Sequence, residues 1–300
     1  MLITEFLSAL EAIVPLSAAG YARDAIGLQV GLPRSTELHA ALFAYEVTRE
    51  VIVEARERGA NLIVAFHPLI FPSIDAITDA TRTGELIREL IRNEIALYVQ
   101  HTAFDTHPEF GTSRLMAEAL SLRNIHILTP LEKKPDAGMG VIGNTEQPIA
   151  ANELLSRVQT VFGTPSIRFS RNGTELLSTI AMVGGAGMEF YSAAVKSGAE
   201  AFITADVRYH DFYRASHDGI LLLDAGHAET EKFVTLGMLR AAQKAVDKIQ
   251  ASEQNFSEGA ERNLMDAAPN AVTLQDGLDT ILLQARTEPN AVQYHHHVQT

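Results

Sequence analysis

The sequence predicts an α/β protein built from two α/β subdomains, with helices packed on mixed, largely parallel sheets. Short apolar runs alternate with amphipathic stretches, which is typical of strands joined by helices in a parallel sheet. A segment rich in Gly, Pro and charge, 128–148, interrupts this alternation. With 300 residues and 46% hydrophobic content, the chain is long enough for one large or two medium domains.

Residues 1–127 contain the elements expected of a first subdomain. Helical periodicity over 3–14 opens it, and this stretch carries acidic residues without a basic region, which favours an amphipathic helix over a signal peptide. The expected elements that follow are a strand at 39–47, a helix at 48–59, a strand at 61–66, a helix at 81–94 and a strand at 95–100.

We expect a second subdomain over 128–218, then a returning strand and helix over 219–249. The expected elements are a helix at 151–163, a strand at 177–185, a helix at 188–198, a strand at 199–206, an apolar run at 219–227 and a long helix at 228–248. The last fifty residues, 250–300, change in composition and are expected to form a weakly ordered extension.

Composition limits the classes of function. The chain has no cysteine, which fits a cytoplasmic location and leaves His and carboxylates to hold any metal. Its formal charge of −13 argues against binding to nucleic acid or to an anionic membrane. The sequence contains no uncharged apolar run of 18 residues, so it predicts no membrane span.

Polar residues of the kinds that bind metals follow several predicted strands. His67 follows 61–66, His101 and Asp105 follow 95–100, Asp206 ends 199–206, and His227 follows the run within 219–227. Ligands bind at the carboxyl ends of strands in open parallel sheets, so these positions indicate a site. Alternatives remain for single residues, since His67 also fits a turn histidine bonded to backbone and Asp105 a turn cap.

The sequence GHAETE gives the strongest local signal. His227 and Glu231 are four residues apart, so on a helix they project from one face, near enough to hold one ion. This spacing also occurs on solvated helix faces, but a buried strand and a Gly turn precede the pair and favour a cleft. His210, in DVRYHDF, fits either a site residue or a helix-start cap. The glycines of 183–190 fit either an anion-binding corner or a tight turn.

Five segments together resemble the NIF-three-like family, whose members are called GTP cyclohydrolase I type 2 homologues. They are DAIGLQVG, LIVAFHPLIF, VQHTAFD, FITADVRYHDF and DAGHAETEKF, in this order over about residues 1–245. The resemblance implies a toroidal homohexamer of two-subdomain chains with a dinuclear centre of divalent metals in the cleft. It also implies metal-ligand roles for His67, Asp105, His227 and Glu231, with Glu231 bridging the ions and His101 a ligand or a supporting residue.

The chain departs from the family pattern at three positions. Phe66 replaces the first histidine of the family's His-His-Pro, and Ala25 and Ala205 replace an asparagine and a glycine. With Phe66 unable to donate a lone pair, His67, Asp105 and Glu231 can hold one ion firmly, whereas the other keeps only His227 and the shared Glu231. We therefore expect one firm ion, Zn, Mn, Fe or Co, and a second that is weak or absent.

The resemblance implies a metal-dependent hydrolase that acts on a nucleotide or a phosphorylated small molecule, with His101 and His210 as candidate proton acceptors. Two alternatives stay open. One is a non-catalytic metal carrier or regulatory protein, in which Phe66 and Ala25 reflect relaxed catalytic demand. The other is a hexameric scaffold, in which metal serves only stability.

Overall fold

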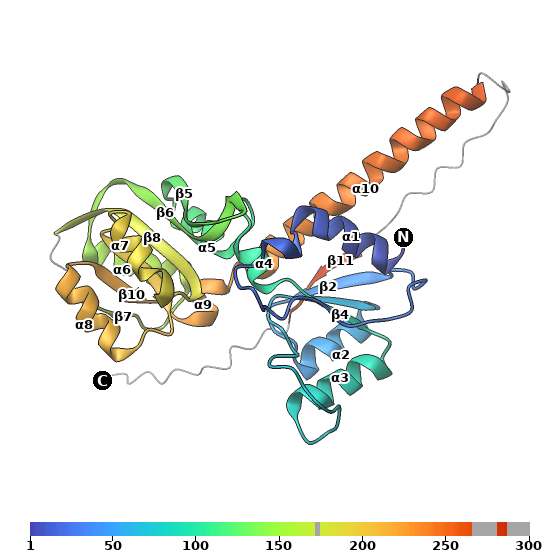
Figure 1. Ribbon diagram of the computed structural model, residues 1–300, viewed down its shortest axis with the longest axis horizontal. Coiled ribbons are helices and arrows are strands. Elements are labelled where there is room, and N and C mark those ends of the chain that lie inside the picture. Colours follow the sequence, from blue (N-terminus) through green and yellow to red (C-terminus); the bar gives the residue numbers. More distant parts are fainter. Residues whose placement is uncertain (172–174, 266–280, 287–300) are drawn as a thin grey trace. The chain divides into compact units, whose positions relative to one another are not determined.

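The chain is α/β, with two mixed sheets that are each covered by helices. The computed structural model (Figure 1) describes residues 1–171, 175–265 and 281–286, and only the backbone of 252–265 and 281. It divides the chain into two compact units. The first unit is Met1–Leu16, Ala25–Gln100 and Met238–Thr287, and the second contains Ser17–Asp24 and His101–Gly237.

The sheet of the first unit has the strand order β1-β4-β3-β2-β11. Its strands are β1 (Gly27–Val30), β2 (Ala40–Ala44), β3 (Leu62–Ala65), β4 (Ala96–Val99) and β11 (Ile281–Gln284). All neighbours are parallel except β1, which is antiparallel to β4. The parallel neighbours β2, β3 and β4 are joined by helices, as the alternating pattern predicted.

Helices cover both faces of this first sheet (Figure 1). On one face, α2 (Arg49–Glu57) and α3 (Arg82–Arg92) bury their apolar side against alternate strand residues such as Leu42 and Ile63. On the other lies α1 (Ile3–Ile13), whose Glu11 accepts a hydrogen bond from the Tyr98 hydroxyl of β4. Because both faces are covered, β2, β3 and β4 are apolar throughout and buried along their length.

Part of the region expected to be a weakly ordered extension is regular structure. The helix α10 (Val234–Met265) continues beyond the predicted end at 248, and β11 pairs in parallel with β2. At this sheet edge, the short apolar run of β11 gains burial and a hydrogen-bonded neighbour. The polar residues around it in the sequence gave no indication of this strand. Residues 266–280 and 287–300 of the predicted extension lie outside the described residues.

The sheet of the second unit has the order β5-β6-β8-β9-β10-β7. Its strands are β5 (Arg123–Leu131), β6 (Lys134–Ala150), β7 (Arg168–Phe169), β8 (Leu176–Ala186), β9 (Ala201–Ala205) and β10 (Leu221–Asp224), and only β8, β9 and β10 run parallel. One face packs on α5 (Thr112–Ala119) and α6 (Ala151–Phe162). The other packs on α7 (Tyr191–Lys196) and α8 (Tyr209–Asp218).

The shorter elements of this unit are η1 (Leu16–Ala18, shared with the first unit), α4 (His101–Asp105), η2 (Met188–Phe190) and α9 (His227–Glu231). The segment 128–148, where the sequence shows a break in the alternation of helices and strands, belongs to β5 and the long strand β6. Glycine allows close packing here, since a Cβ on Gly138 would lie 2.3 Å from the Thr129 carbonyl oxygen.

In the described part of the chain, no helix is long and apolar enough to cross a membrane.

The Glu54 carboxylate links α2 to Arg286, the second residue after β11. It accepts hydrogen bonds from the Arg286 backbone N–H at 2.9 and 3.0 Å and from the Arg58 guanidinium at 2.6 Å. Hydrogen bonds to a charged group contribute about 1.5–3 kcal/mol. We therefore expect Glu54→Gln to speed hydrogen exchange of the 281–286 backbone by about tenfold or more. Glu57→Gln, an exposed change on the same helix, is the control, and equal exchange in both variants would contradict the prediction.

Candidate metal centre

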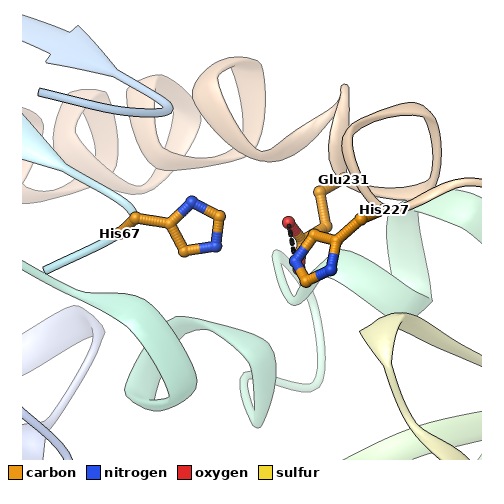
Figure 2. Close-up of side chains that lie close together, drawn as sticks. All are labelled: His67, His227 and Glu231. Atoms are coloured by element: carbon orange, nitrogen blue, oxygen red, sulfur yellow. Dashed lines mark ion pairs between the residues drawn. The ribbon is translucent and has the colours of Figure 1, made fainter. Parts of the chain in front are cut away.

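His227 and Glu231 are the first and last residues of α9, a short helix that follows β10. Gly226 takes a φ of 88°, a left-handed conformation that turns the chain into α9. One turn apart on α9, His227 Nε2 and Glu231 Oε2 lie 3.1 Å from each other, and Figure 2 shows the ion pair between them. The Glu231 side chain is only 5% exposed, so its charge needs a positive partner.

Asp206 fixes the orientation of the His227 ring. Its Oδ2 atom lies 2.6 Å from His227 Nδ1, which leaves Nε2 as the nitrogen that faces Glu231. A carboxylate bonded to the distal nitrogen is the usual support of a histidine that binds a metal. Asp206 itself takes a φ of 53°, so the left-handed residue at this strand end is Asp206 and not Ala205, which replaces a glycine of the family pattern.

Three carboxylates surround the histidine of α4. His101 Nδ1 lies 2.7 Å from Asp24 Oδ1, and the other oxygen of Asp24 accepts hydrogen bonds from the backbone N–H and the hydroxyl of Thr102. Burial lowers the pKa of His101, but the bond to Asp24 and the charges of Asp24, Asp105 and Glu231 together raise it above its usual value. His101 therefore lies within electrostatic reach of two of the predicted metal ligands.

Asp105, at the end of α4, accepts a hydrogen bond from the Thr112 hydroxyl at the start of α5. This bond joins two short helices that were not predicted from the sequence. It holds one carboxylate oxygen of Asp105 in place.

His67 follows β3 in the first unit and is also labelled in Figure 2. Its Nδ1 atom lies 3.3 Å from Glu46 Oε2, and Arg82 contacts the other oxygen of Glu46 at 3.2 Å. Burial raises the pKa of Glu46, but the contacts with His67 and Arg82 outweigh it and lower the pKa. Phe66 beside it is fully buried and stacks on Tyr45 with ring centroids 6.1 Å apart.

His210 lies on the first turn of α8, where it is exposed and its ring meets the edge of Tyr209 at 5.4 Å between centroids. The sequence did not predict that Asp24, Glu46 and Asp206 are the carboxylates that hold the histidines. Asp206 was visible as a strand-end residue, but its partner was not. Asp24 opens the segment DAIGLQVG, but neither Asp24 nor Glu46 could be paired with a histidine, because the residues that they contact are distant in sequence.

The glycines of 183–190 pack against α5 and α9. A Cβ on Gly185 would lie 2.3 Å from Glu231 Oε1, and one on Gly184 would lie 2.4 Å from the Thr112 methyl carbon. The Gly185 N–H donates to the Thr230 hydroxyl, and the Gly184 N–H donates to the Ser113 hydroxyl. The two amides are thus used inside the unit, which favours the tight-turn interpretation over an anion-binding corner.

The side chains of the second unit suit a divalent cation. The charges of Asp105 and Glu231 both raise the pKa of His101. The His227 ring contacts Asp206 through Nδ1 and Glu231 through Nε2. Oxygen and imidazole nitrogen ligands fit Zn, Mn, Fe or Co. The pair His227 and Glu231 provides one nitrogen and one oxygen that can hold such an ion.

The fold and the α9 pair define a two-sheet α/β protein whose His and Glu side chains can hold a metal ion. The family model Duf34/NIF3 (NGG1p interacting factor 3) matches residues 1–260. The chain therefore belongs to the Duf34/NIF3 family, as the sequence motifs predicted.

Relatives and solved structures agree with this assignment. A GTP cyclohydrolase 1 type 2 homolog of Clostridium perfringens is 31% identical over 252 residues, or 84% of this chain and 94% of the relative. A protein of the same name from Streptococcus pneumoniae is 34% identical over 76% of this chain and 85% of its own length. The crystal structure of a Bacillus cereus protein related to NIF3 matches with a TM-score of 0.82 at 21% identity, over 98% of this chain and 99% of the other, and this likeness shows the fold.

Gly185 allows the close approach of β8 to Glu231. We expect Gly185→Ala to lower metal affinity by at least tenfold, because the added methyl group would displace the Glu231 carboxylate. Gly198→Ala is the matched control, since Gly198 also has a positive φ, 77°, but an added Cβ there meets nothing within 4 Å. Both variants strain the backbone by about 1–2 kcal/mol, so titration with Zn²⁺ separates strain from loss of the site. Equal affinity in the two variants would contradict this role of Gly185.

His227 gives the metal-free protein a distinct pH dependence. Burial lowers its pKa, but Glu231 and Asp206 raise it from 6.5 to about 9. A raised pKa in the folded state contributes stability that is complete below about 6.5 and is lost as pH rises through about 9. In EDTA, we expect the unfolding temperature of the protein to fall more steeply between these pH values than that of His227→Gln. Parallel curves for the two proteins would refute the assignment.

Proposed function

We propose that this chain is a divalent-metal-binding protein and that it acts as a metal-dependent hydrolase on a nucleotide or a phosphorylated small molecule. The observation that carries the proposal is the α9 pair, in which Asp206 holds His227 Nδ1 and directs Nε2 toward the buried Glu231 carboxylate. The name of the relatives, GTP cyclohydrolase 1 type 2 homolog, supports a nucleotide as the substrate class.

The proposed ligands are His227 and Glu231, together with Asp105 and His67, which the family motifs assign. Three histidines share one arrangement that supports this set. His67, His101 and His227 each have Nδ1 within 3.3 Å of a carboxylate oxygen, which is the usual support of a histidine that binds a metal through Nε2. His101 is proposed either as a further ligand or as a proton acceptor.

A bound divalent ion supplies Lewis acidity, which polarises a substrate oxygen and lowers the pKa of coordinated water. The residues of the chain handle the proton. His101 Nε2 is suited to accept it, because Asp24 holds Nδ1 and stabilises the positive charge that the ring then carries. His210, which is exposed on α8, is the second candidate for this step.

The burial of Phe66 favours a second candidate function, a non-catalytic metal carrier or regulatory protein with a degenerate dinuclear site. Phe66 stands where the family has a histidine, and it is fully buried and stacked on Tyr45. A residue packed in this way offers no ligand, so we propose one firmly held ion and a second that is weak or absent. Metal that transfers readily to a chelator without any turnover would favour the carrier.

We also propose, from the family resemblance, that the chain assembles as a homohexamer. Light scattering after size-exclusion chromatography measures the number of chains in solution. Dissociation on chelation, in a protein without hydrolytic activity, would favour a scaffold in which the metal serves stability.

Metal content per chain, measured by elemental analysis on untagged protein, tests the metal assignment. We expect about one ion in the wild type and less than a tenth of that in Glu231→Gln, which keeps the shape of the side chain but removes its charge. Phe66→His is expected to raise the content toward two. A variant with His295, His296 and His297 replaced by alanine is the control for adventitious binding.

Full metal occupancy in Glu231→Gln would remove Glu231 from the site. Two ions in the wild type would contradict the one-ion expectation and would favour the hydrolase. Release of phosphate or of a ring-opened product from nucleotides, lost in Glu231→Gln and Asp105→Asn, separates the hydrolase from both alternatives.

A further inference from the structure

A second candidate site in the second unit is a cavity of about 250 Å³ between the α4–α5 segment and the β5–β6 hairpin. Its lining includes Asp105, His107, Arg114, His126, Ile127 and Val141. The volume is slightly below the roughly 300–1,000 Å³ of typical small-molecule sites. A small metabolite therefore matches it better than a large cofactor.

The polar residues of the lining include two that can donate hydrogen bonds, His107 and Arg114. His107 Nδ1 accepts the backbone N–H groups of Glu109 and Phe110, both at 3.1 Å, so the proton of the neutral ring is on Nε2. The His107 ring also stacks on Phe110, with centroids 4.9 Å apart, which fixes its orientation. The loop therefore holds His107 in the tautomer that donates from Nε2.

Arg114 adds a permanent positive charge to the lining of the cavity. Its Nε donates to Glu118 at 2.7 Å, one turn further along α5, and its side chain is 34% exposed. Among the described residues, this is the hydrogen bond that Arg114 makes, and it leaves the two terminal nitrogens of the guanidinium for a ligand. A guanidinium presented in this way fits a phosphate or carboxylate group in two-point contact.

Other residues of the lining determine what the rest of the ligand would contact. Ile127 and Val141 offer apolar surface, and Asp105 belongs both to this lining and to the proposed metal ligands. A ligand with its anionic group at Arg114 would thus lie beside the metal centre. A net charge of −13 makes a cavity with one arginine and two histidines on its wall a distinctive feature of this chain.

We propose that this cavity binds a phosphorylated small molecule, with the phosphate at Arg114 and His107 and the remainder between Ile127 and Val141. The proposal deepens the proposed function, on which it rests for the neighbouring metal chemistry. It assigns Arg114 and His107 as the residues that recognise the anion and His126 as a further contact at the exposed edge.

Binding of AMP, adenosine and inorganic phosphate to the full chain by titration calorimetry tests the proposal. The titrations are made with the metal-loaded chain and repeated after EDTA treatment and dialysis of the chelator, so that an effect of the metal is measured separately from binding in the cavity. We expect AMP to bind more tightly than adenosine, and Arg114→Gln to weaken AMP at least tenfold, as loss of a charged hydrogen bond predicts. Arg114→Lys keeps the charge without the planar guanidinium group. We expect its affinity for AMP to lie between those of the wild type and Arg114→Gln.

Arg157→Gln is the matched control, because Arg157 also forms an ion pair with a glutamate four residues away on an exposed helix face of the same unit. It should bind AMP like the wild type, and His126→Gln should bind it more weakly. Equal affinity of wild type, Arg114→Gln and Arg157→Gln, or no binding of AMP or phosphate at millimolar concentration, would overturn the proposal. Either failure leaves metal content unchanged, whereas loss of metal binding alone would count against the proposed function.

Discussion

The buried carboxylate of Glu231 is the constraint on which the site depends. A charge that is 5% exposed must have a positive partner, and His227 Nε2 at 3.1 Å provides one when it carries a proton. The same position suits a metal ion, for which the proton is a substitute. The pKa of His227 is raised in the metal-free protein because the surrounding carboxylates stabilise a positive charge at this position, whether it belongs to a proton or to a metal ion.

Other parts of the second unit follow from this one side chain. Gly185 has no Cβ because Glu231 Oε1 occupies the space where one would lie, and the Gly185 N–H is satisfied by Thr230 on the same short helix as Glu231. Asp206, in a left-handed conformation at the end of β9, holds the ring of His227 from the opposite side. Three strand ends, those of β8, β9 and β10, are thus shaped by a single buried charge.

The sequence predicted the strands and helices of both units well where periodicity was strong, as in α2, α3 and β2 to β4. It did not predict the strands at 128–148, because glycines that bring β5 and β6 together resemble those of a loop, or β11, because three apolar residues in a polar tail give no sign of a distant partner. For the site, it predicted that His227 and Glu231 lie together, since their spacing is local, and the structure places His227 Nε2 3.1 Å from Glu231 Oε2. The carboxylates that orient the histidines escaped it, because Asp24 and His101, or Glu46 and His67, meet only through the fold.

Asp105 connects the two proposed sites in the second unit. One of its oxygens is held by Thr112, and the residue also lines the cavity that contains Arg114. Without a cation, the Asp105 charge repels an anion placed in that cavity, and a metal ion bound to Asp105 removes this repulsion. On the two proposals, metal and phosphorylated ligand therefore favour each other's binding, and linkage requires that the effect be equal in both directions. A carboxylate shared in this way would bring the ligand to the metal only when the metal is present.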